Sequence, residues 1–193
     1  MDIQAKEKWN KIYSQTNVEN QSVSRVLLDN AYLLPQKGRA LDLACGAGAD
    51  AIYLANHGLD VDAWDISDTV IGKLSAYAKE NALSIHADAR DINLSAPQKN
   101  HYDVICVAHF LERELVPVLV DSLAADGLLV YQTFSQEVTP DYTGPRNPAF
   151  RLEKNELLDL FSDLQLVVYR EEGLLGDLTQ GFRNEVMYIG QKH

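Results

Sequence analysis

A short apolar run that ends in a glycine-rich turn constrains this sequence more than any other feature. Residues 39–58 read RALDLACGAGADAIYLANHG. The segment ALDLAC has the composition of a buried strand, and ADAIYLANHG has the pattern of a helix that Gly58 closes. A strand that passes through such a turn directly into a helix is typical of α/β proteins that bind an adenosine cofactor at the turn.

Strand and helix patterns alternate after residue 38. The expected strands are ALDLAC, VDAWD, LSIHAD, YDVICVAHF and LLVYQTF, followed by LQLVVYRE and RNEVMYIGQ with no helix between these last two. Intervening helices imply right-handed crossovers and parallel strands, whereas two adjacent strands pair antiparallel. We predict an α/β fold with a doubly wound, seven-stranded, mainly parallel sheet and an antiparallel C-terminal hairpin. Residues 1–193 are expected to form one domain, in which 1–35 make an N-terminal helical cap.

Composition excludes several classes of partner. The chain carries 28 acidic and 17 basic residues, a formal charge of −11, and no cluster of basic residues that would bind phosphates. The first residues are polar, and no apolar run approaches the roughly 20 residues that span a bilayer. Cys45 and Cys106 both lie in apolar strand patterns, as reduced core thiols do, and the histidines lack metal-ligand spacing. We therefore expect a cytoplasmic monomer or homodimer without nucleic acid, membrane or metal.

Three aspartates lie in or at the end of the first three expected strands. Asp65 lies 19 residues past Gly46, where a carboxylate can accept both hydroxyls of an adenosine ribose. Asp88 closes the third strand, within reach of an adenine amino group. Asp42 lies in an otherwise apolar strand, so its burial needs a hydrogen-bond reason. It either fixes the turn by accepting backbone N–H groups or helps to hold a ligand ammonium.

These acids bear on which adenosine cofactor the turn holds. The G-x-G-x-x-A spacing of residues 46–51 also fits a dinucleotide site, but a pyrophosphate gains nothing from an acid ahead of the turn. S-adenosylmethionine carries a sulfonium and an ammonium, and a nearby carboxylate stabilises both positive charges. The acids therefore favour S-adenosylmethionine, with NAD as the alternative.

With these motifs in order, residues 38–191 resemble the class I S-adenosylmethionine-dependent methyltransferases. The motif of that class, an acid followed by a glycine turn, reads LDLACGAGAD here, with Ala44 where many members have a first glycine. The resemblance implies a Rossmann-like methyltransferase fold, with S-adenosylmethionine as the cofactor and S-adenosylhomocysteine as the product. On this sequence it implies a cofactor site made of Asp42, Ala44, Gly46, Gly48, Asp65, Ile66, Asp88, Ala89, Ala108 and Tyr13.

A narrower resemblance covers nearly the whole chain. The segments WNKIY, FLER and GPRNPAFRLEKNELLDLF, with the glycine turn, are similar to the small methyltransferases grouped with the tellurite-resistance methyltransferase. The likeness implies a small nucleophile as the acceptor, such as a selenium or tellurium oxyanion. The tellurite enzyme has a histidine–arginine pair and a further arginine in its C-terminal hairpin. Arg183 matches the further arginine, and the segment EGLLGDLTQG departs from the pattern by lacking the pair.

The acceptor residues follow from the chemistry of methyl transfer. An acceptor that is already an anion needs no base, only cationic or polar groups that hold it in line. The candidates for acceptor contact are Arg183, His109, Arg113 and Arg146. The long segment 135–150, rich in proline, is expected to cover the acceptor pocket.

The sequence thus predicts a cytoplasmic methyltransferase that uses S-adenosylmethionine on a small molecule. Two other classes stay open: an S-adenosylmethionine-binding sensor or assembly partner without turnover, and an NAD-dependent oxidoreductase. Trp9 and Tyr13 are expected either to form an aromatic lid over the cofactor or to pack the N-terminal helix.

Overall fold

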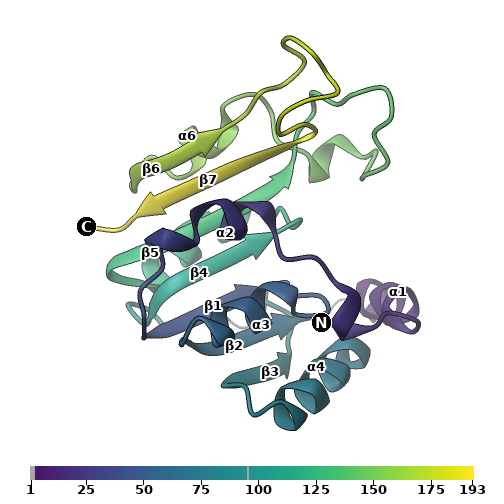
Figure 1. Ribbon diagram of the computed structural model, residues 1–193, viewed down its shortest axis with the longest axis vertical. Coiled ribbons are helices and arrows are strands. Elements are labelled where there is room, and N and C mark those ends of the chain that lie inside the picture. The colour runs from purple at the N-terminus through teal and green to yellow at the C-terminus, as the bar shows by residue number, and fades with distance from the viewer. Residues whose placement is uncertain (1–2, 95) are drawn as a thin grey trace.

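Seven strands form one sheet in the order β3-β2-β1-β4-β5-β7-β6 in the computed structural model, which describes residues 3–94 and 96–193 (Figure 1). The strands are β1 (Arg39–Leu43), β2 (Asp60–Asp65), β3 (Ile85–Ala89), β4 (Tyr102–Ala108), β5 (Leu123–Phe134), β6 (Gln165–Arg170) and β7 (Glu185–Gln191). The first five run parallel, and β7 is antiparallel to both β5 and β6. This topology confirms the predicted doubly wound sheet with its antiparallel hairpin. The strand order reverses between β1 and β4, where such sheets bind ligands.

Helices cover both faces of the sheet (Figure 1). The described helical segments are α1 (Ile3–Tyr13), η1 (Val18–Asn20), α2 (Arg25–Asn30), η2 (Ala31–Leu33), α3 (Ala49–Asn56), α4 (Asp68–Glu80), η3 (Arg113–Leu115), α5 (Val116–Ser122), η4 (Pro148–Phe150) and α6 (Glu156–Leu160). Side chains of α2, α3 and α4 contribute to one of two large apolar clusters, and those of α5 and α6 contribute to the other. Val70 and Ile71 of α4 lie with Ala47 in a third, small cluster. None of these helices has the length and apolar composition that crossing a membrane requires.

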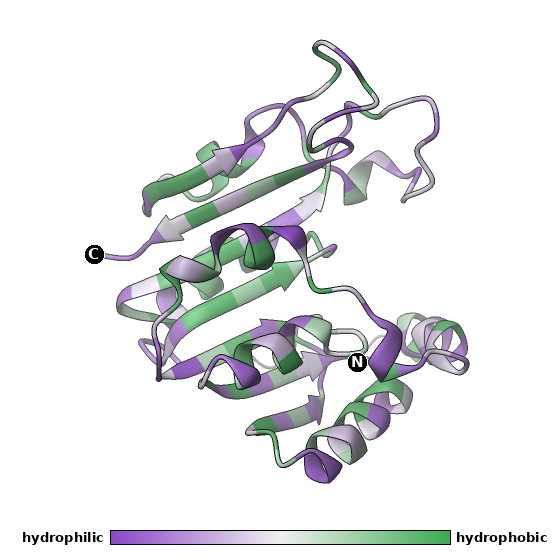
Figure 2. Ribbon diagram, viewed as in Figure 1, coloured by the Kyte–Doolittle hydropathy of each residue, from purple (hydrophilic) through white to green (hydrophobic). Residues whose placement is uncertain are grey.

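The two clusters follow from the alternation of side chains along each strand. In β1, Ala40 packs on the side of α3, while Leu41 and Leu43 pack on the side of α5. The strands appear almost continuously hydrophobic in the middle of the sheet, because both faces there are covered (Figure 2). The edge strand β3 differs, because its residues alternate between partly buried and exposed.

The segment ELVPVLVDSLAADG, residues 114–127, has a helical pattern, but only part of it forms a helix. Helix α5 ends at Ser122, and β5 begins at Leu123. Leu123 pairs with Tyr102, and regular pairing resumes only at Leu128 with Val104, so a bulge separates the two. Asp126 within this bulge has a positive φ of 62°, a conformation that no helix contains.

Three residues of the turn between β1 and α3 have a left-handed backbone conformation. Ala44, Gly46 and Gly48 have φ angles of 55°, 51° and 79°. A Cβ on Gly48 would come within 2.5 Å of the Leu74 methyl groups, so glycine is required there for packing as well as for backbone freedom. Ala44 carries its Cβ in a conformation that costs an L-residue about 1–2 kcal/mol.

We expect Ala44→Gly to stabilise the protein. Relief of the left-handed strain outweighs the added unfolded-chain entropy of glycine, leaving a net gain of about 0.5–1 kcal/mol and a rise in Tm of about 1–4 °C. Ala55→Gly within α3 is the matched control and should lower Tm, because glycine costs about 1 kcal/mol in a helix interior. Differential scanning calorimetry of both variants measures the effect, and a Tm for Ala44→Gly at or below that of the parent would contradict it.

Candidate functional site

The Asp65 carboxylate joins two loops at the carboxyl edge of the sheet. One carboxylate oxygen accepts the backbone N–H of Gly46 at 3.0 Å, and the other accepts that of Ser67 at 2.9 Å. The residue is 6% exposed, and burial raises the pKa of its carboxyl group. A carboxylate has about four acceptor sites, so these hydrogen bonds leave capacity to accept from a ligand hydroxyl. The glycine turn and the start of α4 are thus held together around one acceptor group.

Three further predicted residues lie along the same edge. Ile66 directly follows β2, and Ala89 ends β3 in register with Asp65. Ala108 ends β4, two strands away across β1. The carboxyl ends of these parallel strands therefore form one continuous edge with the glycine turn, which is the place where open α/β sheets bind ligands.

Asp42 faces α3 rather than the open edge. Its carboxylate accepts the N–H of Ala51 at 2.9 Å, and its residue is 2% exposed. This contact supports the interpretation that Asp42 fixes the turn. Asp50 lies beside it, accepting the N–H of Ser24 at 2.7 Å and the thiol of Cys106 at 3.5 Å. The ligand atoms of Asp42, Asp50 and Cys106 lie within 4.8 Å of one another.

Burial and mutual repulsion control the protonation of this cluster. Burial raises the pKa of Asp42, and the neighbouring Asp50 raises it further. Burial likewise raises the pKa of the Asp50 carboxyl. Two carboxyl groups this close share protons rather than both ionising. Burial also raises the pKa of the Cys45 and Cys106 thiols. Cys106 is buried and Cys45 is half-buried, and both are free thiols.

The N-terminal helix α1 lies against α4 and brings Tyr13 over the glycine turn. A Cβ on Gly46 would meet the Tyr13 hydroxyl at 2.9 Å, and Trp9 stacks on the Tyr13 ring at 5.5 Å. The Lys73 ammonium donates to the carbonyls of Tyr13, Ser14 and Thr16 at 2.8–3.0 Å. A lysine at the carbonyl end of a helix also interacts favourably with the helix dipole. Lys73 therefore fastens the end of α1 over the turn.

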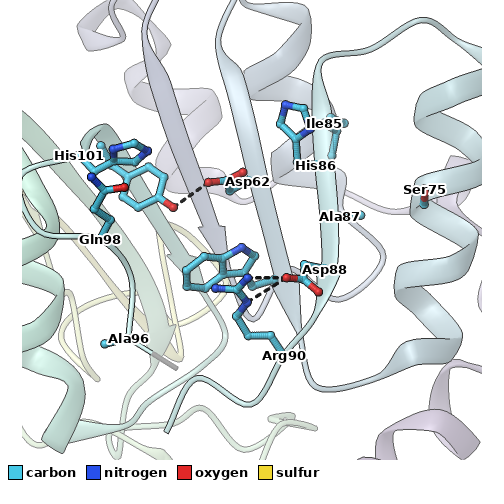
Figure 3. Close-up of a pocket in the computed structure, with 12 residues that line it drawn as sticks. Asp62, Ser75, Ile85, His86, Ala87, Asp88, Arg90, Ala96, Gln98 and His101 are labelled. Atoms are coloured by element: carbon cyan, nitrogen blue, oxygen red, sulfur yellow. Dashed lines mark hydrogen bonds and ion pairs between the residues drawn. The ribbon is translucent and has the colours of Figure 1, made fainter. Parts of the chain in front are cut away.

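The Asp88 side chain points to the face of the sheet opposite to the one that α4 covers. Its carboxylate accepts hydrogen bonds from the Arg90 guanidinium, which stacks on the Trp64 ring at 4.0 Å (Figure 3). They border an open polar cavity of about 640 Å³. Ala89 packs toward α4, and successive strand residues point to opposite faces. The structure therefore does not place Asp88 with the other predicted cofactor residues.

Asp91 is the buried acid beyond β3. It is 9% exposed, and its carboxylate accepts the N–H of Asn93 at 3.1 Å. The preceding N–H, that of Arg90, donates to the Asp65 carbonyl at 2.8 Å, which brings this segment to the carboxyl edge of β2. The sequence HADARDI offered two acids, and strand alternation was the signal that could have separated them.

His109 and Arg183 line a second cavity, of about 380 Å³, at the end of β4. Its other walls are residues 22–25, Gln132, residues 181–182 and Glu185. None of the residues that line it comes from segment 135–150, which the sequence predicted as its cover. The cavity adjoins Ala108, so it lies on the same edge as the predicted cofactor residues.

Arg113 and Arg146 do not line this cavity. Arg113 pairs with Glu156 and donates to the carbonyls of Ala149 and Arg151, so it holds the segment that contains η4. Arg146 is exposed. Because Glu156 begins α6, the Arg113 contacts tie the loop after β5 to the helical layer. The structure gives Arg113 a structural contact in place of the predicted acceptor contact.

Gln132 and Glu185 are the polar cavity residues that the sequence prediction missed. Gln132 is 4% exposed, accepts the N–H of Val26 at 2.7 Å and donates to Glu185. Both belong to strands of hydrophobic character, β5 and β7, and a polar residue in such a strand was the available signal. Their pairing depends on the antiparallel register of β5 with β7.

Solved structures identify the class to which this fold belongs. The chain matches the crystal structure of TehB from Haemophilus influenzae with a TM-score of 0.73 and 24% identity, covering 97% of this chain and 67% of that one. It matches a TehB-like SAM-dependent methyltransferase from Corynebacterium glutamicum with a TM-score of 0.67 and 16% identity, covering 98% and 99% of the two chains. These likenesses show the Rossmann-like fold of the class I S-adenosylmethionine-dependent methyltransferases, as the sequence predicted.

Sequence comparison narrows this class to a family. The family model described as "Tellurite resistance protein TehB" matches residues 1–186, and the chain belongs to that family. A Haemophilus influenzae relative, described as a "Probable S-adenosyl-L-methionine-dependent methyltransferase TehB", is 31% identical over 154 residues, which cover 76% of this chain and 52% of the relative. The chain spans about half the length of the curated relatives it matches.

We expect Lys73→Met to loosen α1 without unfolding the sheet. Loss of three charge-assisted hydrogen bonds, partly exposed to solvent, should raise amide hydrogen exchange in residues 5–13 about tenfold, which corresponds to about 1.4 kcal/mol of local stability. Lys79→Met, on the same helix, is the matched control. Equal exchange rates in α1 for the two variants would show that Lys73 does not fasten this helix.

Proposed function

We propose that this chain transfers a methyl group from S-adenosylmethionine to a small-molecule acceptor. The observation that carries the proposal is the buried Asp65 carboxylate, which bridges the backbone N–H groups of Gly46 and Ser67 at the carboxyl edge of the sheet. Its position suits the two ribose hydroxyls of an adenosine. A bound cofactor supplies the electrophilic methyl group on a sulfonium.

The residues around Asp65 fit the remaining parts of that cofactor. The adenine would lie between Ile66 and Ala89, with Asp91 as the acceptor for its amino group in place of Asp88. The methionine portion would lie against the Gly46 turn, where the nearest atom to an added Cβ is the movable Tyr13 hydroxyl at 2.9 Å. A glycine there lets a ligand approach the backbone closely.

The acids beneath the turn argue against NAD. A pyrophosphate binds at the N-terminus of the helix after the turn. In this chain Asp50 lies in the first turn of α3, and Asp42 hydrogen-bonds to the same end of the helix. Negative charge there repels a pyrophosphate, while it stabilises a sulfonium and an ammonium.

The small size of the second cavity supports a small acceptor. Its volume of about 380 Å³ is near the lower end of the roughly 300–1,000 Å³ found for ligand pockets. It lies at the end of β4, adjacent to the edge proposed for the cofactor. Transfer by in-line displacement then requires mainly that the two ligands be positioned and water excluded.

We expect Asp65→Ala to weaken S-adenosylmethionine binding by about 1–3 kcal/mol, or about 5- to 150-fold in Kd, because charge-assisted hydrogen bonds to the ribose are lost. Isothermal titration calorimetry measures the change. Asp62→Ala is the matched control, since Asp62 lies on the same strand but bonds to Tyr102 on the opposite face. Unchanged affinity for Asp65→Ala would overturn the assignment of Asp65 to the ribose.

A thermal-shift comparison of ligands tests the cofactor itself. S-adenosylmethionine or S-adenosylhomocysteine at about 100 times its Kd should stabilise the fold by about 2.7 kcal/mol and raise Tm by roughly 5–11 °C. NAD at the same concentration should leave Tm unchanged. A shift with NAD alone would favour the oxidoreductase alternative, and binding without S-adenosylhomocysteine formation on any acceptor would favour the sensor.

A further inference from the structure

His109 is held in an unusual backbone conformation at the mouth of the second cavity. Its φ is 57°, a left-handed conformation that is uncommon for non-glycine residues and occurs at active sites among other places. Its N–H donates to the Gln132 carbonyl at 2.8 Å, and its ring packs against Phe134 with centroids 5.1 Å apart. The side chain is 45% exposed. The ring is therefore fixed in place while keeping contact with solvent.

Glu185 orients the His109 ring from the neighbouring hairpin. A Glu185 oxygen lies 3.2 Å from His109 Nε2, and the other oxygen accepts from the Gln132 amide. Gln132 is itself held by the Val26 N–H. Because Nε2 bonds to a carboxylate, Nε2 carries the proton and Nδ1 keeps the lone pair. A histidine oriented by a carboxylate in this way is the arrangement that proteins use for a general base.

The arginines that line the cavity have other partners. The Arg183 guanidinium donates to four backbone carbonyls, those of Glu172, Gly173, Asp177 and Gln180. Arg25 pairs with Asp29 at 3.3 Å and stacks on the Phe182 ring. Among the described residues that line this cavity, His109 and Glu185 form a carboxylate–histidine pair, while both arginine guanidinium groups are engaged elsewhere. Such a cavity suits a neutral acceptor better than an oxyanion.

We propose that His109 is the general base of this enzyme, that Glu185 positions it, and that the acceptor is a neutral X–H nucleophile of the thiol or phenol class. This inference rests on the proposed methyltransferase function. Thiols and phenols ionise mostly above pH 8, so in the neutral range they react faster when a base removes the proton. An oxyanion would need no such base.

The step balances in atoms and charge. The acceptor's sulfur or oxygen forms a bond to the methyl carbon as the bond from that carbon to the sulfonium breaks, and the electron pair of the broken bond stays on the departing thioether. The acceptor proton passes to His109 Nδ1, producing an imidazolium beside Glu185. The exposed side of the ring then releases that proton to solvent.

Charged groups on every side of His109 set its titration. The hydrogen bond from Glu185 on β7 raises the pKa of His109, burial lowers it, and Asp50 on α3 raises it. Arg25, the first residue of α2, and Arg183, two residues before β7, are the cationic residues that line the same cavity. A base works only when deprotonated, so methyl transfer should rise with pH through the His109 pKa. Removing the Glu185 charge lowers that pKa and moves the rise to lower pH.

The test measures kcat against pH from 5 to 9 for the whole chain, with 2-mercaptoethanol and phenol as acceptors and with selenite and tellurite as the contrast. His109→Gln should lose about 10²- to 10⁴-fold in kcat while binding S-adenosylmethionine within about twofold. Glu185→Gln should shift the rising limb down by about one pH unit. His86→Gln is the matched control, because His86 pairs with Asp60 on the far face of the sheet and should retain the parent profile.

Each other outcome overturns the inference. A kcat for His109→Gln within threefold of the parent value would exclude His109 as the base. A rise of kcat with pH at the same pH in Glu185→Gln as in the parent would exclude Glu185 as the residue that positions it. Turnover of selenite or tellurite alone, or of no acceptor in the panel, would exclude the neutral X–H class. Absence of S-adenosylmethionine binding to the parent chain in calorimetry would instead reject the proposed function, so the two failures are distinguishable.

Discussion

Both oxygens of one buried carboxylate, that of Asp65, accept backbone N–H groups from two loops that are far apart in sequence. One loop is the glycine turn that starts α3, and the other starts α4 at Ser67. This pair of hydrogen bonds holds the loop after β1 beside the loop after β2. The N–H groups of Gly46 and Ser67 are therefore already paired with Asp65. The edge proposed to bind the cofactor therefore exists before the ligand arrives, and little ordering entropy remains to oppose binding.

Buried negative charge shapes the chemistry behind that edge. Asp42 and Asp50 lie against the start of α3, where helix N–H groups stabilise carboxylates. This arrangement competes with the anion-binding use of a helix N-terminus. A glycine turn of the same length therefore suits an anionic ligand when no acids lie beneath it, and a cationic ligand when acids do.

The sequence was informative where the signal was local. It was not informative where the result depended on the face of the sheet to which a side chain points. The order of strands and helices was readable because apolar periodicity reports burial directly. The choice between Asp88 and Asp91 was not, because a shift of one position along a strand reverses the face to which a side chain points. The ion pair of Arg113 was not readable either, since its partner Glu156 lies 43 residues away and no local sequence pattern indicates that pair.

The sequence by itself determined the fold class, the glycine turn and the acid at the end of β2, because each follows from patterns within a few residues. Only the tertiary structure decided which polar groups converge at the second cavity. Gln132 and Glu185 meet through the register of β5 with β7, and His109 reaches them from β4. Antiparallel register brings together residues more than 50 positions apart, and neither composition nor spacing encodes that alignment.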